Sequence, residues 1–100
     1  MTNTPFDEAK AEHMERLEQF TPIVERVHGE NHPEFFEVRK IFDQLNEKVK
    51  TNRELGLDKE FSELRKITNN YKVPNDVCES YEAVYNMLEE LNQAYLANKK

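Results

Sequence analysis

Four stretches of the chain carry mainly apolar residues spaced alternately three and four positions apart, and this spacing constrains the fold more than any other feature. Side chains three or four positions apart lie on one face of an α-helix, so each stretch predicts a helix with a narrow apolar face. The four sets are His13, Leu17, Phe20, Val24 and Val27; Phe35, Val38, Phe42, Leu45 and Val49; Leu57, Phe61, Leu64, Thr68 and Tyr71; and Val77, Tyr81, Val84, Leu88, Leu91 and Tyr95. Four such faces bury one another in an antiparallel bundle whose helices cross at about 20°.

Capping and breaking residues set the ends of these helices. Thr4-Pro5-Phe6-Asp7 fits an N-cap, a proline in the first turn and an acid at the third helical position, so the first helix should begin at Pro5. Gly29 and Gly56 are natural stops, Pro33 starts a second helix, and Val73-Pro74-Asn75-Asp76 breaks the chain and caps the last helix. The predicted helices are 5–28, 33–54, 58–71 and 75–98.

The connections between these helices are short, which makes neighbouring helices antiparallel. We therefore predict an all-α fold, an antiparallel up-down-up-down four-helix bundle in which residues 1–100 form a single domain. Charged residues make up 34% of the chain and apolar residues 37%, with only two glycines, a balance that suits a helical protein. Pro22 lies inside the 5–28 pattern and predicts a kink near residues 18–22.

Charge and hydropathy argue against two classes of partner. The net charge of −6 and the lack of a basic stripe do not suit nucleic acid, whose phosphates must be neutralised by Lys and Arg on one face. No apolar run is long enough to span a bilayer, and Met1 to Lys10 lacks the apolar core of a signal peptide. We expect no membrane partner and a cytoplasmic location, which agrees with the single cysteine, Cys78.

The three histidines are the first candidates for a functional site. His28 and His32 are four positions apart, a spacing that binds zinc when both lie on one helical turn, but Gly29 and Pro33 interrupt that turn. The favoured interpretation is a pair of loop histidines at helix ends, and the alternative is a surface metal contact with Glu30 or Glu34. His13 lies in the first apolar face, where a buried histidine bonded to a neighbour is more common than a metal ligand.

Carboxylates and the thiol complete the inventory of reactive groups. The acids of the last two helices lie off the apolar faces and predict a solvated acidic surface; they are Glu60, Glu63, Glu79, Glu82, Glu89 and Glu90. Cys78 lies near the start of the last helix, where the helix dipole favours a thiolate, although a small buried hydrophobe is the commoner role. The chain has no Ser/His/Asp set, Gly-rich phosphate loop or CxxC pair, so we expect no hydrolase or transferase activity.

Two segments resemble a known family. "ERVHGENHPEFFEVRKIF", Glu25 to Phe42, is similar to the junction between the first two helices of the hemerythrin-like iron-sulphur cluster repair proteins, the RIC (repair of iron centres) family. "ITNNYKVPNDVCESYEAVYNMLEEL", Ile67 to Leu91, resembles the segment that leads into the fourth helix of the same family. The residues that match the family motifs are His28, Gly29, His32, Pro33, Asn69, Asn70, Tyr71, Pro74 and Cys78.

The resemblance implies a hemerythrin-like bundle, but a shortened one without the family's ligand-bearing end. RIC proteins hold a di-iron centre with histidines and glutamates at the end of the bundle opposite the junction. The corresponding positions here are Asp7, Asn52, Glu54, Gly56 and Asn98, which supply an incomplete ligand set. Iron binding stays open only through weak candidates, namely Asp7, Glu54, His13, His28 and His32. The cysteine-bearing N-terminal domain of longer members has no counterpart in these 100 residues.

Three functional hypotheses follow from this sequence. The first is a RIC-like protein associated with iron-sulphur cluster repair or with the response to nitrosative or oxidative stress, lacking an intact di-iron centre. The second is a metal-free helical module that binds a protein partner or itself, with Phe36, Tyr85 and Tyr95 beside the apolar faces as candidate contacts. The third is a thiol-based sensor at Cys78.

Overall fold

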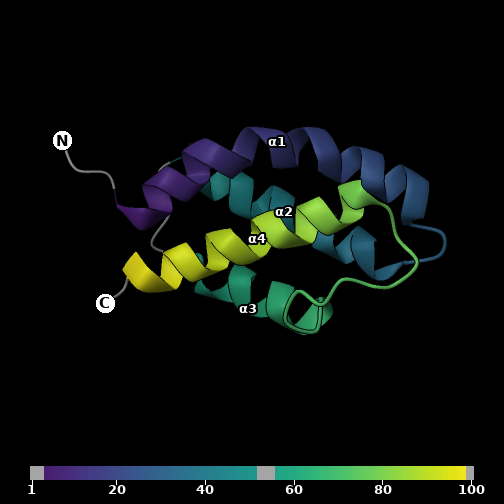
Figure 1. Ribbon diagram of the computed structural model, residues 1–100. Coiled ribbons are helices and arrows are strands. Elements are labelled where there is room, and N and C mark those ends of the chain that lie inside the picture. Colours follow the sequence, from purple (N-terminus) through teal and green to yellow (C-terminus); the bar gives the residue numbers. More distant parts are fainter. Residues whose placement is uncertain (1–3, 52–55, 99–100) are drawn as a thin grey trace.

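The chain forms four α-helices, which agrees with the predicted all-α four-helix bundle (Figure 1). The computed structural model describes residues 4–51 and 56–98. Its helices are α1 (Pro5–His28), α2 (Glu34–Lys50), α3 (Asp58–Ile67) and α4 (Glu79–Asn98), and the described residues include no strand. The bounds of α1 are those predicted, and the helix continues through Pro22.

The helices run alternately up and down along a body 43 Å long and about half as wide. α1 packs against α4 and α2, and α2 also packs against α3. The α1–α2 turn and the connection from α3 to α4 lie together at one end, while the first residues of α1 and the last of α4 lie at the other (Figure 1). None of the described helices is long and apolar enough to cross a membrane.

The first helix begins with the predicted capping box. The Asp7 backbone N–H donates to Thr4 Oγ1 at 3.1 Å, and the Thr4 N–H donates to the Asp7 carboxylate at 3.4 Å. These two bonds satisfy backbone donors that the first turn of a helix leaves without partners. α2 follows Pro33, its N-cap, and ends at Lys50 with Thr51 in a turn; the rest of the predicted helix, residues 52–54, lies outside the described part of the chain.

The core is formed by the predicted apolar faces, with one systematic drift along α1. Val27, expected in the core, is 59% exposed, whereas the neighbouring His28 is half-buried. A strict three-four repeat follows 3.5 residues per turn, so over a helix of 24 residues it rotates away from the true period of 3.6. The inward-facing position at the end of α1 therefore passes from Val27 to His28.

Two predicted surface residues are buried. Tyr85, expected beside the core, is 1% exposed because its ring stacks on Phe35 of α2. Tyr95, placed both in the last apolar face and among the candidate contacts, is 6% exposed against Phe6 and Phe61. Glu60, expected on a solvated acidic surface, is also buried. Lys48 Nζ of α2 lies 2.8 Å from Glu60 Oε2, and this ion pair between two helices compensates part of the burial cost of the carboxylate; Glu60 Oε1 has no hydrogen-bond partner among the described residues.

α3 ends four residues earlier than predicted. Helical hydrogen bonding stops at Ile67, and Asn69, Asn70 and Tyr71 have positive φ angles of 54°, 61° and 63°. A left-handed residue other than Gly costs roughly 1–2 kcal/mol, less for Asn, so the chain reverses here at some expense. The turn still buries Thr68 and Tyr71, which is why the apolar spacing fitted a longer helix.

α4 begins at Glu79 rather than at residue 75. The predicted cap residues, Asn75 and Asp76, lie in a turn that precedes the helix. Cys78 is the residue just before α4, and its carbonyl accepts a hydrogen bond from the Glu82 N–H at 3.2 Å. The side chain of Asp76 is used elsewhere, in a contact described below.

Candidate functional site

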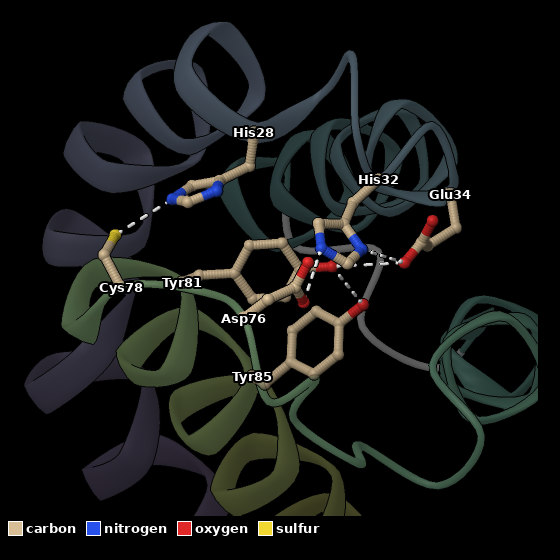
Figure 2. Close-up of polar contacts among 7 residues, drawn as sticks. All are labelled: His28, His32, Glu34, Asp76, Cys78, Tyr81 and Tyr85. Carbon is tan, nitrogen blue, oxygen red and sulfur yellow. Dashed lines mark hydrogen bonds and ion pairs between the residues drawn. The ribbon is translucent and has the colours of Figure 1, made fainter.

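The two histidines of the α1–α2 turn meet the segment that precedes α4 (Figure 2). His28 is the last residue of α1, and His32 follows a tight turn in which its backbone N–H donates to the His28 carbonyl at 2.8 Å. Asp76 and Cys78 come from the connection between α3 and α4, more than 40 residues later in the sequence. We call His28, His32, Asp76, Cys78 and Tyr81 the histidine junction.

His28 and Cys78 form the first contact of the histidine junction. The imidazole Nε2 of His28 lies 3.1 Å from Sγ of Cys78, which is exposed. The histidine ring also stands edge-on against Tyr81, with ring centroids 5.5 Å apart and an interplanar angle of 90°. Tyr81 thus fixes the plane of the imidazole and helps to aim its Nε2 at the thiol (Figure 2).

His32 is held between two carboxylates. Its Nδ1 lies 3.2 Å from Oε2 of Glu34, and its Nε2 lies 3.0 Å from Oδ1 of Asp76. A doubly protonated ring can donate to both carboxylates at once, whereas a neutral ring can donate to only one of them. His32 also contacts Tyr81, so the two histidines flank the same aromatic ring.

A pair of buried tyrosines lies beneath the histidines. The hydroxyls of Tyr81 and Tyr85 are 3.1 Å apart, and the Tyr81 hydroxyl donates to Glu34 Oε2 at 3.4 Å. Burial is the main cause that raises the pKa of Tyr81, with further contributions from the Tyr85 hydrogen bond and Glu34. Burial likewise raises the pKa of Tyr85. Both side chains therefore remain neutral phenols at physiological pH.

This arrangement can support thiol chemistry. A thiol beside an imidazole can pass its proton to the ring nitrogen, leaving the thiolate, which is the nucleophilic form of cysteine. The favoured interpretation of Cys78 as a small buried residue was wrong: it is exposed just before α4, so a reagent can reach Sγ from solvent. The carboxylates hold His32 rather than His28, so the ring nitrogen beside the thiol has no carboxylate bonded to it among the described residues.

The opposite end of the bundle, where the resemblance implies a di-iron centre, is packed with aromatic rings. Phe6, Phe61 and Tyr95 are in mutual contact, with ring centroids between 5.1 and 6.2 Å apart; we call them the aromatic cluster. The Asp7 carboxylate serves the capping box and lies 3.3 Å from Lys10. Its hydrogen bond with Thr4 is the largest cause that lowers the pKa of Asp7.

These residues do not fit a di-iron centre. Such a centre needs several His, Asp or Glu side chains at one level of the bundle. No group of three or more His, Cys, Asp or Glu side chains close enough to hold a metal ion exists within residues 4–51 and 56–98. Glu54, a weak candidate from the sequence, lies outside the described residues.

Of the remaining candidates, His13 lies apart, whereas the others lie in or next to the histidine junction. His13 is buried in α1, as expected, with Nε2 3.4 Å from Glu90 Oε2 of α4. His28 and His32 lie in the histidine junction, and Pro33 and Gly29 shape the turn between them. Asn69, Asn70, Tyr71 and Pro74 belong to the connection between α3 and α4, next to the junction.

Sequence reasoning missed two members of the histidine junction. Tyr81 was predicted only as a core residue, and Asp76 only as a cap for the last helix. The contacts of Asp76 with His32 and of Cys78 with His28 join positions 44 and 50 residues apart. Local periodicity carries no signal for contacts at this range. The resemblance gave an indirect signal, because it singled out the two segments that meet here.

Comparisons of the chain with known protein families, curated proteins and solved structures gave no match. The resemblance to RIC proteins therefore rests on the quoted segments alone.

Proposed function

We propose that this protein takes part in the maintenance of iron-sulphur centres under nitrosative or oxidative stress, as RIC proteins do, and that it works through the histidine junction rather than through a di-iron centre. The observation that supports the proposal is the meeting of the two RIC-like segments at one end of the bundle. His28 and His32 come from one segment, and Asp76 and Cys78 come from the other.

In this proposal, the chain acts by exchange at Cys78. The Sγ proton passes to His28 Nε2, and the thiolate accepts the nitroso group of a low-molecular-weight S-nitrosothiol, whose sulphur leaves as a thiolate and takes up the proton. The exchange needs no external oxidant, because the nitroso group moves from one sulphur to another. A single free cysteine suits a reducing compartment such as the cytoplasm.

A repair assay tests this function. Purified protein is added, with ferrous iron and a thiol reductant, to a [4Fe–4S] dehydratase of the aconitase type that a low-molecular-weight S-nitrosothiol has inactivated, and recovered activity is followed with time. We expect recovery to be faster with the protein than with iron and reductant alone. Cys78→Ser should remove the acceleration, whereas Glu79→Gln, at an exposed neighbouring position, should keep it. Equal recovery with and without the protein would refute the proposal.

Metal analysis separates this mechanism from iron chemistry. Protein from iron-replete cells, purified without oxygen, should contain clearly less than one iron per chain and still accelerate recovery. Two irons per chain, together with the visible absorption of an oxo-bridged pair, would replace the thiol mechanism by the family's metal mechanism.

The second candidate function is that of a metal-free helical bundle that binds a protein partner or a second copy of itself. Ile23 and Val27 lie one turn apart on α1 and are 46% and 59% exposed, and exposed apolar side chains on one helix face favour a contact surface. Light scattering should then give a dimer mass for the wild type and a monomer mass for Ile23→Glu. A monomer at millimolar wild-type concentration would exclude self-association through this face.

A further inference from the structure

The connection between α3 and α4, residues 68–78, is less regular than its sequence predicts. The apolar spacing extends α3 to Tyr71, and the cap residues start α4 at Asn75, so only residues 72–74 should lie outside a helix. In the structure both helices are shorter, and the whole of residues 68–78 is non-helical. We call this segment the strap; it runs along the junction end of the bundle in Figure 1.

One hydrogen bond within the turn and one to α4 hold the first half of the strap in a left-handed turn. Asn69, Asn70 and Tyr71 all have positive φ, a conformation that bulky residues such as Tyr rarely adopt. The Tyr71 N–H donates to Thr68 Oγ1 at 2.8 Å, and the Tyr71 hydroxyl donates to Asn92 Oδ1 of α4 at 2.8 Å. Tyr71 is therefore anchored at both its backbone and its side chain.

Two long-range contacts hold the second half. Asp76 is bonded to His32, and Cys78 is bonded to His28. Both contacts are made by exposed strap side chains with residues at the end of α1 and in the following turn. The strap is thus bonded at three places to side chains of other elements, and Tyr71, Val73 and Val77 also pack against the apolar core.

The strap forms one side of a small open cavity beside the tyrosine pair. The cavity, of about 250 Å³, is lined on the bundle side by Ile67, Glu34 and Tyr85, and on the strap side by Thr68, Asn69 and residues 72–75. Tyr85 is only 1% exposed, so the strap and its neighbours keep this ring from solvent. Glu34 is already partly exposed, so displacing the strap would chiefly uncover Tyr85, next to the histidine junction.

We propose that the strap is a conformational device with two arrangements. The closed arrangement is the one described, with a left-handed turn at residues 69–71. In the open arrangement α3 continues through Tyr71, the strap leaves the cavity, and the contacts with His28 and His32 are lost. A continuous helix is feasible because Tyr71 falls on the same face as Leu64 and Phe61, so its ring still points to the core. The proposal does not depend on the function proposed above.

Substitutions at Asn70 test the device with a matched pair. Asn70 is exposed and has a φ of 61°. Glycine adopts this conformation freely, whereas alanine resists it and favours helix, so Asn70→Ala should open the strap and Asn70→Gly should close it. The Cα chemical shifts of residues 69–71 report the ratio of the open, helical arrangement to the closed one, and this ratio should be roughly 5- to 30-fold higher in Asn70→Ala than in Asn70→Gly, the factor expected from the cost of a left-handed alanine.

Chemical shifts distinguish opening from general loosening. In Asn70→Ala, the Cα shifts of residues 69–71 should move towards helical values, and core amides of α1 and α2 should exchange as in the wild type. Tyr71→Phe, which removes the bond to Asn92, should move the Cα shifts of residues 69–71 in the same direction and provides a second reading if Asn70→Ala folds poorly. Equal Cα shifts in the two Asn70 variants, faster exchange across all four helices, or non-helical shifts in Asn70→Ala would each overturn the proposal.

Discussion

Replacing Gly29 with alanine should destabilise the protein, whereas the same change at Gly56 should not. A Cβ atom added at Gly29 would lie 2.4 Å from the Glu25 carbonyl oxygen and 2.7 Å from Cζ of Phe36. Real Cβ atoms essentially never come within 3.0 Å of such neighbours. At Gly56 the nearest atom is the flexible end of Lys48, at an ordinary 3.5 Å, and neither glycine has a positive φ.

The expected size of the effect follows from these contacts. At Gly29 the backbone of Glu25 must shift and the Phe36 ring must turn away, and overpacking of this kind costs about 1–3 kcal/mol. At Gly56 the lower entropy of the unfolded chain should give a neutral effect or a gain of up to about 1 kcal/mol. The free energies of unfolding of the two variants should therefore differ by roughly 1–4 kcal/mol.

Urea unfolding followed by far-ultraviolet circular dichroism measures this difference. The slope of the unfolding free energy against urea should be the same in all variants, so that the midpoint reports stability. Adding Phe36→Ala to Gly29→Ala should recover part of the loss, because one of the two close contacts disappears. If Gly29→Ala and Gly56→Ala unfold at the same urea concentration, the geometric argument is wrong.

Three further predictions concern other parts of the bundle. Phe61→Ala should cost about 3–5 kcal/mol in urea unfolding because Phe61 is 1% exposed, whereas Phe36→Ala should cost about 1 kcal/mol or less because Phe36 is 49% exposed; equal losses would contradict this ranking. Thr4→Ala should cost about 1 kcal/mol by removing the N-cap of α1, and an unchanged midpoint would mean that the cap is not formed in solution. The Asn46 hydrogen bond is the largest cause that lowers the pKa of Glu18 below its ordinary value of 4.5, so Glu18 stabilises the fold above that value and less as the pH falls through its folded pKa. Asn46→Ala should raise the Glu18 pKa in a carboxyl NMR titration, and an unmoved titration curve would show that the bond is absent.

Periodicity predicted the helices well because each helix buries one face. The start of α1 and the burial of His13 followed from local capping signals and from the apolar spacing. The end of α3 could not be predicted from the apolar spacing. Thr68 and Tyr71 are buried in the left-handed turn and would also be buried in a longer helix, so the spacing does not distinguish the two structures. Glu60 was misplaced for a related reason, since its burial depends on Lys48 of another helix.

The candidate site was only half predictable. The α1–α2 turn with its two histidines is visible in the sequence, because Gly29 and Pro33 mark helix boundaries. The partners of those histidines cannot be identified from the sequence. The local pattern around Asp76 predicts a helix cap, and Asp76 meets His32 only in the folded bundle. Contacts within helices and turns thus place the two histidines, whereas contacts between distant segments bring Asp76 and Cys78 to them.

The aromatic cluster has a practical consequence for experiments on the histidine junction. The rings of Phe6 and Tyr95 lie 5.4 Å apart, so the beginning of α1 and the end of α4 are side by side at one end of a body 43 Å long (Figure 1). A chain immobilised or fused to a reporter through either of these two ends would present the histidine junction outwards. Surface-binding measurements can therefore use either attachment, and a partner that binds a chain attached in this way must approach from the side of His28 and Cys78 or from the flanks of the bundle.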